Sequence, residues 1–287
     1  MRRLLIIGCG DVMRRALPQL VLRWQVLALV RSRDPQLAAL GITQIEGDLD
    51  RPDTLTRLGG ISDAVIHSAP PAAQGTGDTR TRNLIAALQR GKSLPRQLVY
   101  ISTSGVYGDC GGAWVGETRA ASAKSARAAR RVDAERRLRR FGRQRGRHCC
   151  VSILRAPGIY AADRLPLERL HKGQPLMVHG EDSHTNHIHA EDLGRACSAA
   201  LKRGRANRVY NINDDSSLAM GEWFDLLADV FSLPRAPRLP REEVRHAVPA
   251  MQWSFMSESR RLDNTRMKQE LRLRLRYPTV ASGIKSP

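Results

Sequence analysis

Short apolar runs alternate with segments of helical periodicity along the first two thirds of this 287-residue chain. Parallel strands need a long crossover between them, usually a helix, so this alternation predicts an α/β fold with a doubly wound parallel sheet. The runs expected as strands are 4–7, 25–30, 43–46, 64–67, 98–102, 150–154 and 209–212, and the main helices are expected at 79–90, 122–140, 193–201 and 220–231.

A glycine-rich turn follows the first expected strand and opens a helix, with the sequence Gly8-Cys9-Gly10-Asp11-Val12-Met13. In the G-x-G-x-x-G turn of the Rossmann fold, the first glycine permits the bend and the second lets the backbone approach a pyrophosphate. Met13 occupies the third glycine position, so we expect it to shift the helix away from the strand. Pro18 is a second irregularity in this helix. A purely structural turn is the alternative.

The second expected strand ends where a dinucleotide site distinguishes its cofactors at the ribose. Arg31-Ser32-Arg33 stands there in place of the acidic residue that would bind the 2′-hydroxyl of NAD. Arginine pairs with a 2′-phosphate, which favours NADP over NAD, although two solvated arginines in so basic a chain are the alternative. Further cofactor contacts are expected after the third and fourth strands, from Asp48 near the adenine with Leu49 beside it, and from Ser68 and Ala69.

The chain carries a formal charge of +19, and most of this excess lies in two segments. Residues 119–147 hold 12 Lys and Arg against two acidic residues, and residues 260–276 hold seven against two. Neither segment carries a nucleic-acid recognition motif or interleaved aromatic residues, and a basic patch alone reads no bases. We therefore expect no specific nucleic-acid partner, and a small anionic ligand is the better explanation of the charge.

The cysteine pattern and the apolar runs bear on location. The five cysteines are irregularly spaced and contain no Cys-x-x-Cys pair, which is typical of a reduced compartment without a disulfide framework. The initial apolar run is too short for a secretion signal, and no stretch approaches the length of a membrane span. The sequence therefore predicts a soluble cytoplasmic protein without a membrane partner.

The pattern becomes less regular beyond residue 155, where prolines interrupt it repeatedly. We expect residues 1–165 to form a dinucleotide-binding Rossmann domain, with 186–214 packing back onto it. Residues 166–185 and 215–287 would then form a smaller C-terminal lobe on the substrate side, closing over the strand ends. Four histidines crowd into residues 179–189, but no recognised metal-ligand spacing completes them, so no metal is expected. His189 is expected to be structural, with Asp192 capping the following helix.

Several segments taken together resemble a known family. They are Ile101-Ser102-Thr103-Ser104-Gly105-Val106-Tyr107-Gly108, Leu154-Arg155-Ala156-Pro157-Gly158-Ile159-Tyr160, Asn186-His187-Ile188-His189-Ala190-Glu191-Asp192-Leu193 and Tyr210-Asn211-Ile212. In this order they are similar to segments of the NAD-dependent epimerase/dehydratase family of extended short-chain dehydrogenases/reductases, and most similar to an atypical branch of it. The resemblance covers nearly the whole chain. It implies that Ser102, Thr103 and Pro157 lie around the nicotinamide.

The resemblance also implies a catalytic Ser or Thr, and a Tyr-x-x-x-Lys pair on the helix after the fifth strand. The Ser/Thr position falls on Thr103, and Ala134-Glu135 sets the register that puts Arg127 and Arg131 at the Tyr and Lys positions. Arg131 would keep the positive charge of the lysine, whereas Arg127 cannot replace the tyrosine, because a guanidinium does not donate a proton near neutrality. Tyr107 and Tyr160 are the other candidate proton donors, with packing around the loop as the alternative.

These observations predict an NAD(P)-binding, epimerase/dehydratase-like oxidoreductase that lacks the Tyr-x-x-x-Lys pair. Its substrate is expected to be a small anionic molecule, phosphorylated or similar to a nucleotide sugar. The alternative is a catalytically silent NADP-binding sensor or regulatory protein, because fold alone does not establish function. The sequence does not decide the oligomeric state, for which a homodimer is one option.

Overall fold

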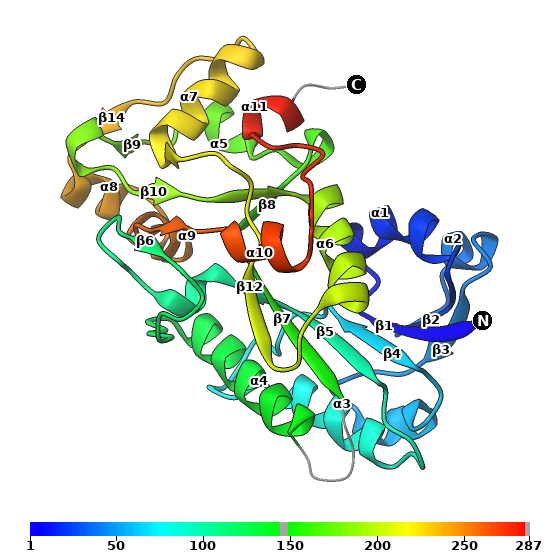
Figure 1. Cartoon of the computed structure of the whole chain (residues 1–287). Helices are drawn as coiled ribbons and strands as arrows, with labels where there is room; N and C mark the ends of the chain where they lie inside the picture. Colours follow the sequence, from blue (N-terminus) through cyan, green and yellow to red (C-terminus); the bar gives the residue numbers. More distant parts are fainter. Residues whose placement is uncertain (144–148, 285–287) are drawn as a thin grey trace.

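The computed structural model describes residues 1–143 and 149–284. Its centre is a seven-stranded sheet in the order β12-β7-β5-β4-β1-β2-β3, with all neighbouring strands parallel (Figure 1). The strands are β1 (Arg2–Ile7), β2 (Trp24–Val30), β3 (Thr43–Glu46), β4 (Ala64–His67), β5 (Gln97–Thr103), β7 (Cys150–Ala156) and β12 (Arg208–Asn211). This order reverses direction at β1, so the predicted doubly wound Rossmann sheet is confirmed.

Both faces of the sheet are covered by helices, because successive strand side chains point to opposite sides. Leu4 and Ile6 of β1 face one apolar cluster, and Leu5 and Ile7 face another. The first cluster is covered by α1 (Asp11–Leu20), α2 (Pro35–Ala39) and α6 (Ala190–Arg203), and the second by η1 (Pro52–Leu58), α3 (Thr79–Gln89) and α4 (Ala126–Gly142). The strands are therefore buried on both sides, as their nearly continuous apolar runs indicate.

Helix α4 begins four residues later than the sequence suggested. The Ser125 side chain accepts a hydrogen bond from the Ala128 backbone N–H at 3.2 Å, which caps the helix at that point. Residues 144–147, at the end of the basic segment 119–147, lie outside the described residues.

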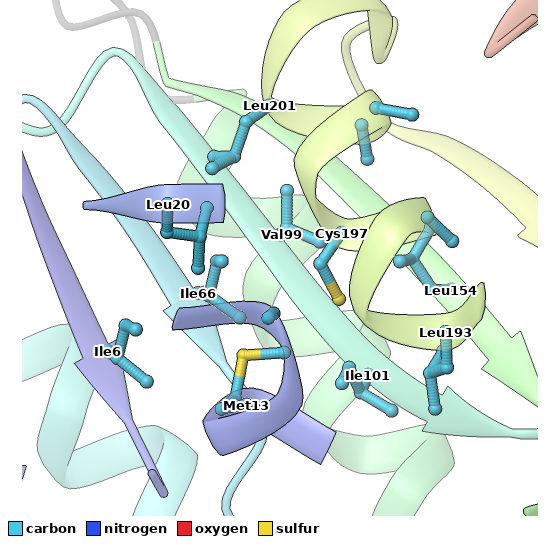
Figure 2. Packing of buried hydrophobic residues seen from close by; sticks show 14 of the residues in the cluster. Ile6, Met13, Leu20, Ile66, Val99, Ile101, Leu154, Leu193, Cys197 and Leu201 are labelled. Atoms are coloured by element: carbon cyan, nitrogen blue, oxygen red, sulfur yellow. The ribbon is translucent and has the colours of Figure 1, made fainter. Parts of the chain in front are cut away.

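Met13 occupies the third glycine position without disrupting the packing of α1. Its side chain is 1% exposed and lies between the helix and the sheet, together with Ile6, Leu193 and Cys197 (Figure 2). A glycine instead allows a close approach between two helices, α1 and α6. A Cβ on Gly194 of α6 would lie 3.0 Å from the Ala16 Cβ, so this glycine permits the contact.

A smaller lobe with its own apolar cluster lies beyond the carboxyl ends of the strands (Figure 1). Its main elements are α5 (Leu167–His171), β9 (Leu176–Met177), α7 (Met220–Val230), β14 (Arg238–Leu239), α8 (Arg241–Ala247), α9 (Ala250–Met256) and α11 (Val280–Gly283). Short strand pairs join it to the sheet: β8 (Gly158–Tyr160) with β11 (His187–His189), β10 (His184–Thr185) with β13 (Leu218–Ala219), and β6 (Trp114–Val115) with β15 (Arg261–Leu262). Three short 3₁₀ helices connect longer elements: η2 (Ser104–Tyr107), η3 (Ala162–Arg164) and η4 (His179–Glu181).

One segment expected in the smaller lobe packs on the sheet instead. Met267 of α10 (Thr265–Glu270), with Leu271 and Leu273 after it, belongs to the apolar cluster under α1 and α6. The division that we expected at residue 215 therefore does not separate the two cores cleanly. The boundary of the lobe stays a prediction.

Candidate cofactor and substrate site

The turn after β1 has the geometry that its glycines suggested. Gly8 has φ +87°, and a Cβ there would lie 2.6 Å from the backbone N of Ala69. The hydroxyl of Ser68 donates to the Gly8 carbonyl at 2.5 Å and so ties the turn to the end of β4. At Gly10, which caps α1, a Cβ would meet no atom within 4 Å. The turn is thus rigid at Gly8 and open at Gly10.

A cavity of about 410 Å³, here called the β2–β3 cavity, lies on one side of this turn. Five residues predicted to bind cofactor line it, namely Gly8, Arg31, Asp48, Leu49 and Ala69. Two further arginines line it that the sequence did not single out: Arg14 on α1 and Arg80 on α3. Arg14 is paired with Asp34 and Arg80 with Asp50, whereas the described residues provide no ion-pair partner for Arg31.

A second cavity of about 290 Å³, here called the β5–β7 cavity, lies on the other side of the turn and shares Gly8 with the first. The predicted residues that line it are Gly10, Asp11, Val12, Ser68, Ser102, Thr103, Arg131 and Pro157. Arg164 of η3 also lines it and had not been predicted. The two cavities together follow the carboxyl edge of the sheet across the point where the strand order reverses, which is where dinucleotides bind in such sheets.

The Asp11 carboxylate, in the lining of the β5–β7 cavity, takes part in an ion network. Its Oδ2 accepts from Arg164 Nη1 at 2.6 Å, and its Oδ1 accepts from Arg15 Nε at 2.9 Å. Arg15 also pairs with Asp163, at 2.6 Å. Burial works against ionisation of Asp11, but the hydrogen bonds from Arg15 and Arg164 outweigh it and lower the pKa of this carboxyl. Asp11 is therefore charged at neutral pH.

The family model described as the NAD dependent epimerase/dehydratase family matches residues 9–213, which is most of the chain. The chain belongs to this family. The resemblance seen in the sequence is thereby confirmed. No curated protein is similar enough to the chain to be counted as a relative.

Solved structures of epimerase and dehydratase type share the fold. A functionally unknown conserved protein from Silicibacter pomeroyi is 26% identical, with a TM-score of 0.81 over 99% of this chain and 97% of that one. UDP-glucose 4-epimerase from Thermotoga maritima is 18% identical, with a TM-score of 0.79 over 99% and 96%. A dTDP-glucose 4,6-dehydratase variant from Streptomyces venezuelae, solved with NAD bound, is 21% identical, with a TM-score of 0.76 over 98% and 95%.

Thr103 and Arg131 lie together in this epimerase/dehydratase fold. Both line the β5–β7 cavity. Arg131 Nη1 donates to the Ile101 carbonyl at 2.8 Å and to the Tyr100 hydroxyl at 3.0 Å, so β5 holds the guanidinium in place. Burial raises the pKa of Tyr100 to about 12, which keeps its hydroxyl protonated beside that cation.

The two tyrosines predicted as candidate proton donors are not brought to this cavity. The Tyr107 hydroxyl donates to Asn211 Oδ1 at 2.8 Å, and the side chain is 1% exposed. The Tyr160 hydroxyl donates to the Thr279 carbonyl at 3.2 Å, and its ring packs edge-on against His189. Neither residue lines the β5–β7 cavity. Their placement matches the packing alternative that the sequence left open.

Arg127, which the resemblance placed at the tyrosine position, stacks its guanidinium on Phe255 of α9, 3.9 Å from the ring centroid. It also does not line the β5–β7 cavity. Of the two arginines expected at the positions of the Tyr-x-x-x-Lys pair, only Arg131 thus lines the cavity.

Within the described residues, no group of His, Cys, Asp and Glu is arranged to hold a metal ion. His189 caps α6 through its own Nδ1, which accepts from the Glu191 backbone N–H at 3.3 Å. The expectation that Asp192 caps this helix is wrong. The buried Asp192 carboxylate instead accepts from the backbone N–H groups of Arg276 and Tyr277, because this returning segment needs an acceptor there.

Two further observations concern the cysteines and the length of the helices. All five cysteines are free. Within residues 1–143 and 149–284, no helix has both the length and the apolar character needed to cross a bilayer.

Proposed function

We propose that this chain is an NADP-binding oxidoreductase of the epimerase/dehydratase type. The observation that carries the choice of NADP is Arg31, which lines the β2–β3 cavity at the end of β2 and has no ion-pair partner among the described residues, whereas Arg14 and Arg80 in the same lining are paired with Asp34 and Asp50. No acidic residue stands at the Arg31 position to bind a 2′-hydroxyl, and a guanidinium forms strong paired hydrogen bonds with phosphate.

The residues present fit a dinucleotide along its whole length. Arg31 would bind the 2′-phosphate, and Asp48 and Leu49 would lie near the adenine. The open face of Gly10 and the N-terminus of α1, through Asp11 and Val12, would receive the pyrophosphate. Ser102, Thr103 and Pro157 would surround the nicotinamide in the β5–β7 cavity.

When bound, the nicotinamide would accept or donate a hydride. We propose that the Thr103 hydroxyl orients the reacting oxygen of the substrate and that Arg131 stabilises negative charge developing on it. Such fixed electrostatic stabilisation is a major source of rate enhancement in enzymes. Arg131 would act by its charge alone, because a guanidinium does not exchange protons near neutral pH. The proton that leaves or joins the substrate oxygen as the hydride moves would be exchanged with water.

The proposed substrate is a small anionic molecule similar to a nucleotide sugar. The support is of two kinds: the arginines around the cavities, and the nucleotide sugars named for family neighbours, such as UDP-glucose in the Thermotoga maritima epimerase structure. The free cysteines fit the proposed cytoplasmic location. Light scattering would test whether the protein is a homodimer.

Thermal unfolding with added cofactor tests the proposal. Ligands that bind the native state raise its stability, by about 2.7 kcal/mol at a hundredfold excess over Kd. We expect NADPH to raise the melting temperature by several degrees and by more than NADH does. Arg31→Ala should remove that difference. The matched control is Arg33→Ala, since Arg33 is exposed and pairs with Glu46 away from the cavity lining. An absence of any shift with either cofactor would refute the proposed function.

A catalytically silent NADP-binding sensor is the second candidate. It is favoured by the positions of Tyr107 and Tyr160, whose hydroxyls bond elsewhere and leave the β5–β7 cavity without a phenol. A substrate screen that follows the absorbance of reduced nicotinamide separates the two candidates, with product analysis added for an epimerase that regenerates its cofactor. Turnover that falls in Arg131→Ala supports the enzyme, whereas NADPH binding without turnover of any alcohol or nucleotide sugar supports the sensor.

A further inference from the structure

An ion pair joins two residues that line the β5–β7 cavity, Asp11 and Arg164. Arg164 Nη1 lies 2.6 Å from Asp11 Oδ2, although the two residues are 153 positions apart in the sequence. Asp11 is the first residue of α1, on the phosphate-binding turn. Arg164 belongs to η3, in the stretch that leads from β8 to α5 of the smaller lobe. The pair therefore links the turn to the start of the lobe.

Arg164 lies where an anion is expected on other grounds. It lines the β5–β7 cavity together with Gly8 and Gly10, and Gly10 presents open space on that side. The N-terminus of α1 adds its unpaired backbone N–H groups and the positive end of the helix dipole. In the structure, the negative charge that Arg164 contacts beside this helix N-terminus is the Asp11 carboxylate.

We propose that Arg164 binds the pyrophosphate of the cofactor, and that its guanidinium is paired with the Asp11 carboxylate as long as no cofactor is bound. This inference rests on the proposed function and assigns a residue that neither the glycine-turn motif nor the family resemblance identified. On binding, Arg164 exchanges the Asp11 carboxylate for phosphate oxygens. The segment between β8 and α5, which leads into the smaller lobe, then contributes a cation to the cofactor site.

The surrounding charges make this exchange favourable. The side chains of Arg164 and Asp11 are 38% and 43% exposed, so water screens the pair and opening it costs little. Phosphate offers the guanidinium two oxygens in the geometry that its N–H groups match. Asp11 does not lose all compensation when Arg164 leaves, because it keeps its hydrogen bond from Arg15 at 2.9 Å.

Isothermal titration calorimetry with two ligands tests the assignment. NADPH contains the pyrophosphate, whereas adenosine 2′-monophosphate contains only the adenosine and the 2′-phosphate. We expect Arg164→Ala to weaken NADPH binding by about tenfold or more, the loss of a charged hydrogen bond, and to leave the affinity for adenosine 2′-monophosphate unchanged. Arg164→Lys should bind NADPH with intermediate affinity, because it keeps the charge and loses the paired hydrogen bonds.

Arg33→Ala is the matched control, because Arg33 is an exposed arginine that pairs with Glu46 and lines neither cavity. We expect it to change NADPH affinity by less than about threefold, as for a screened surface charge. Equal weakening of both ligands by Arg164→Ala would indicate a structural role and overturn the assignment. NADPH binding to Arg164→Ala as tight as to the wild type would also overturn it. A wild-type protein that does not bind NADPH would instead refute the proposed function itself.

Asp11→Asn tests the exchange. Because Arg164 leaves the carboxylate in the complex, the removal of this negative charge near the pyrophosphate should leave NADPH affinity unchanged or increase it. A tenfold loss of affinity would show that Arg164 needs Asp11 in the complex, and would overturn the exchange.

Discussion

Arg155 and Glu135 form an ion pair in the interior of the protein, with 2.7 Å between Nη2 and Oε2 and both side chains 5% exposed. The pair joins β7 to α4 directly behind the β5–β7 cavity. Ser102 donates to the other oxygen of Glu135 at 2.6 Å, and the Arg155 guanidinium lies 4.6 Å from the Tyr107 ring centroid. The wall of the cavity behind Ser102 is therefore held by charged groups.

Loss of one partner of this pair should destabilise the fold strongly. Glu135→Leu would leave the Arg155 charge buried without compensation, which costs about 3–5 kcal/mol in comparable pairs. Urea unfolding measures this cost. The double variant Glu135→Leu/Arg155→Met should recover much of the stability, because two apolar side chains need no compensation. The exposed Glu46→Gln serves as the control and should change little, since Glu46 pairs with Arg33 in solvent. A Glu135→Leu protein as stable as the wild type would contradict the prediction.

The two glycines of the turn should respond differently to alanine. Gly8→Ala would place a Cβ 2.6 Å from the Ala69 backbone at a φ of +87°, so we expect a loss of about 2 kcal/mol or more in the free energy of unfolding. Gly10→Ala meets open space and should cost at most about 1 kcal/mol as a poorer helix cap. Its methyl group would enter the space proposed for the pyrophosphate, so NADPH affinity should fall about tenfold or more. Calorimetry and urea unfolding give both quantities, and full NADPH affinity in Gly10→Ala would argue against that placement.

Restoring the family's third glycine should weaken this protein. Met13 is 1% exposed in the apolar cluster between α1 and the sheet (Figure 2). Met13→Gly would leave a cavity and introduce a flexible residue into a helix, at a combined cost of about 3 kcal/mol or more. Urea unfolding should show this against Met251→Ala, whose side chain is 76% exposed and should matter little. An unchanged midpoint for Met13→Gly would mean that α1 closes onto the sheet.

Buried histidines should make the fold sensitive to acid. Burial lowers the pKa of His187 to about 3, well below its ordinary value of 6.5. Between pH 6.5 and pH 3, His187 is therefore protonated in the unfolded chain and neutral in the native state. The stability contributed by neutral His187 is complete above pH 6.5 and is lost as the pH falls towards 3, at roughly 1.4 kcal/mol per pH unit.

His187→Phe keeps an aromatic ring beside Tyr160 and Trp223 and removes this titration. The acid limb of its stability curve, measured by urea unfolding at successive pH values, should be flatter than that of the wild type. The exposed His246→Gln should leave the limb as it is. Parallel curves for His187→Phe and wild type would exclude His187 as a source of the acid sensitivity.

The elements of the sheet could be predicted from the sequence because their signals are local. Strands β4 and β3 begin and end at the residues that the sequence predicted, Ala64–His67 and Thr43–Glu46. The Gly8–Asp11 turn and the position of Arg31 at the end of β2 could likewise be predicted from a few consecutive residues. Periodicity and turn chemistry act over such distances and need no knowledge of the rest of the chain.

Tertiary structure alone decided which distant side chains meet. Arg164 reaches Asp11 only because η3 returns to the turn, and Tyr107 is held away from the cavity by Asn211, 104 residues later in the chain. Asp192 follows the helix-capping residue His189 but binds the segment at residues 276–277 instead. These contacts depend on how the smaller lobe packs on the sheet, and no local pattern encodes that packing. The sequence by itself thus determined the Rossmann sheet and the glycine turn after β1, whereas packing decided which charged and hydroxyl groups face the cavities.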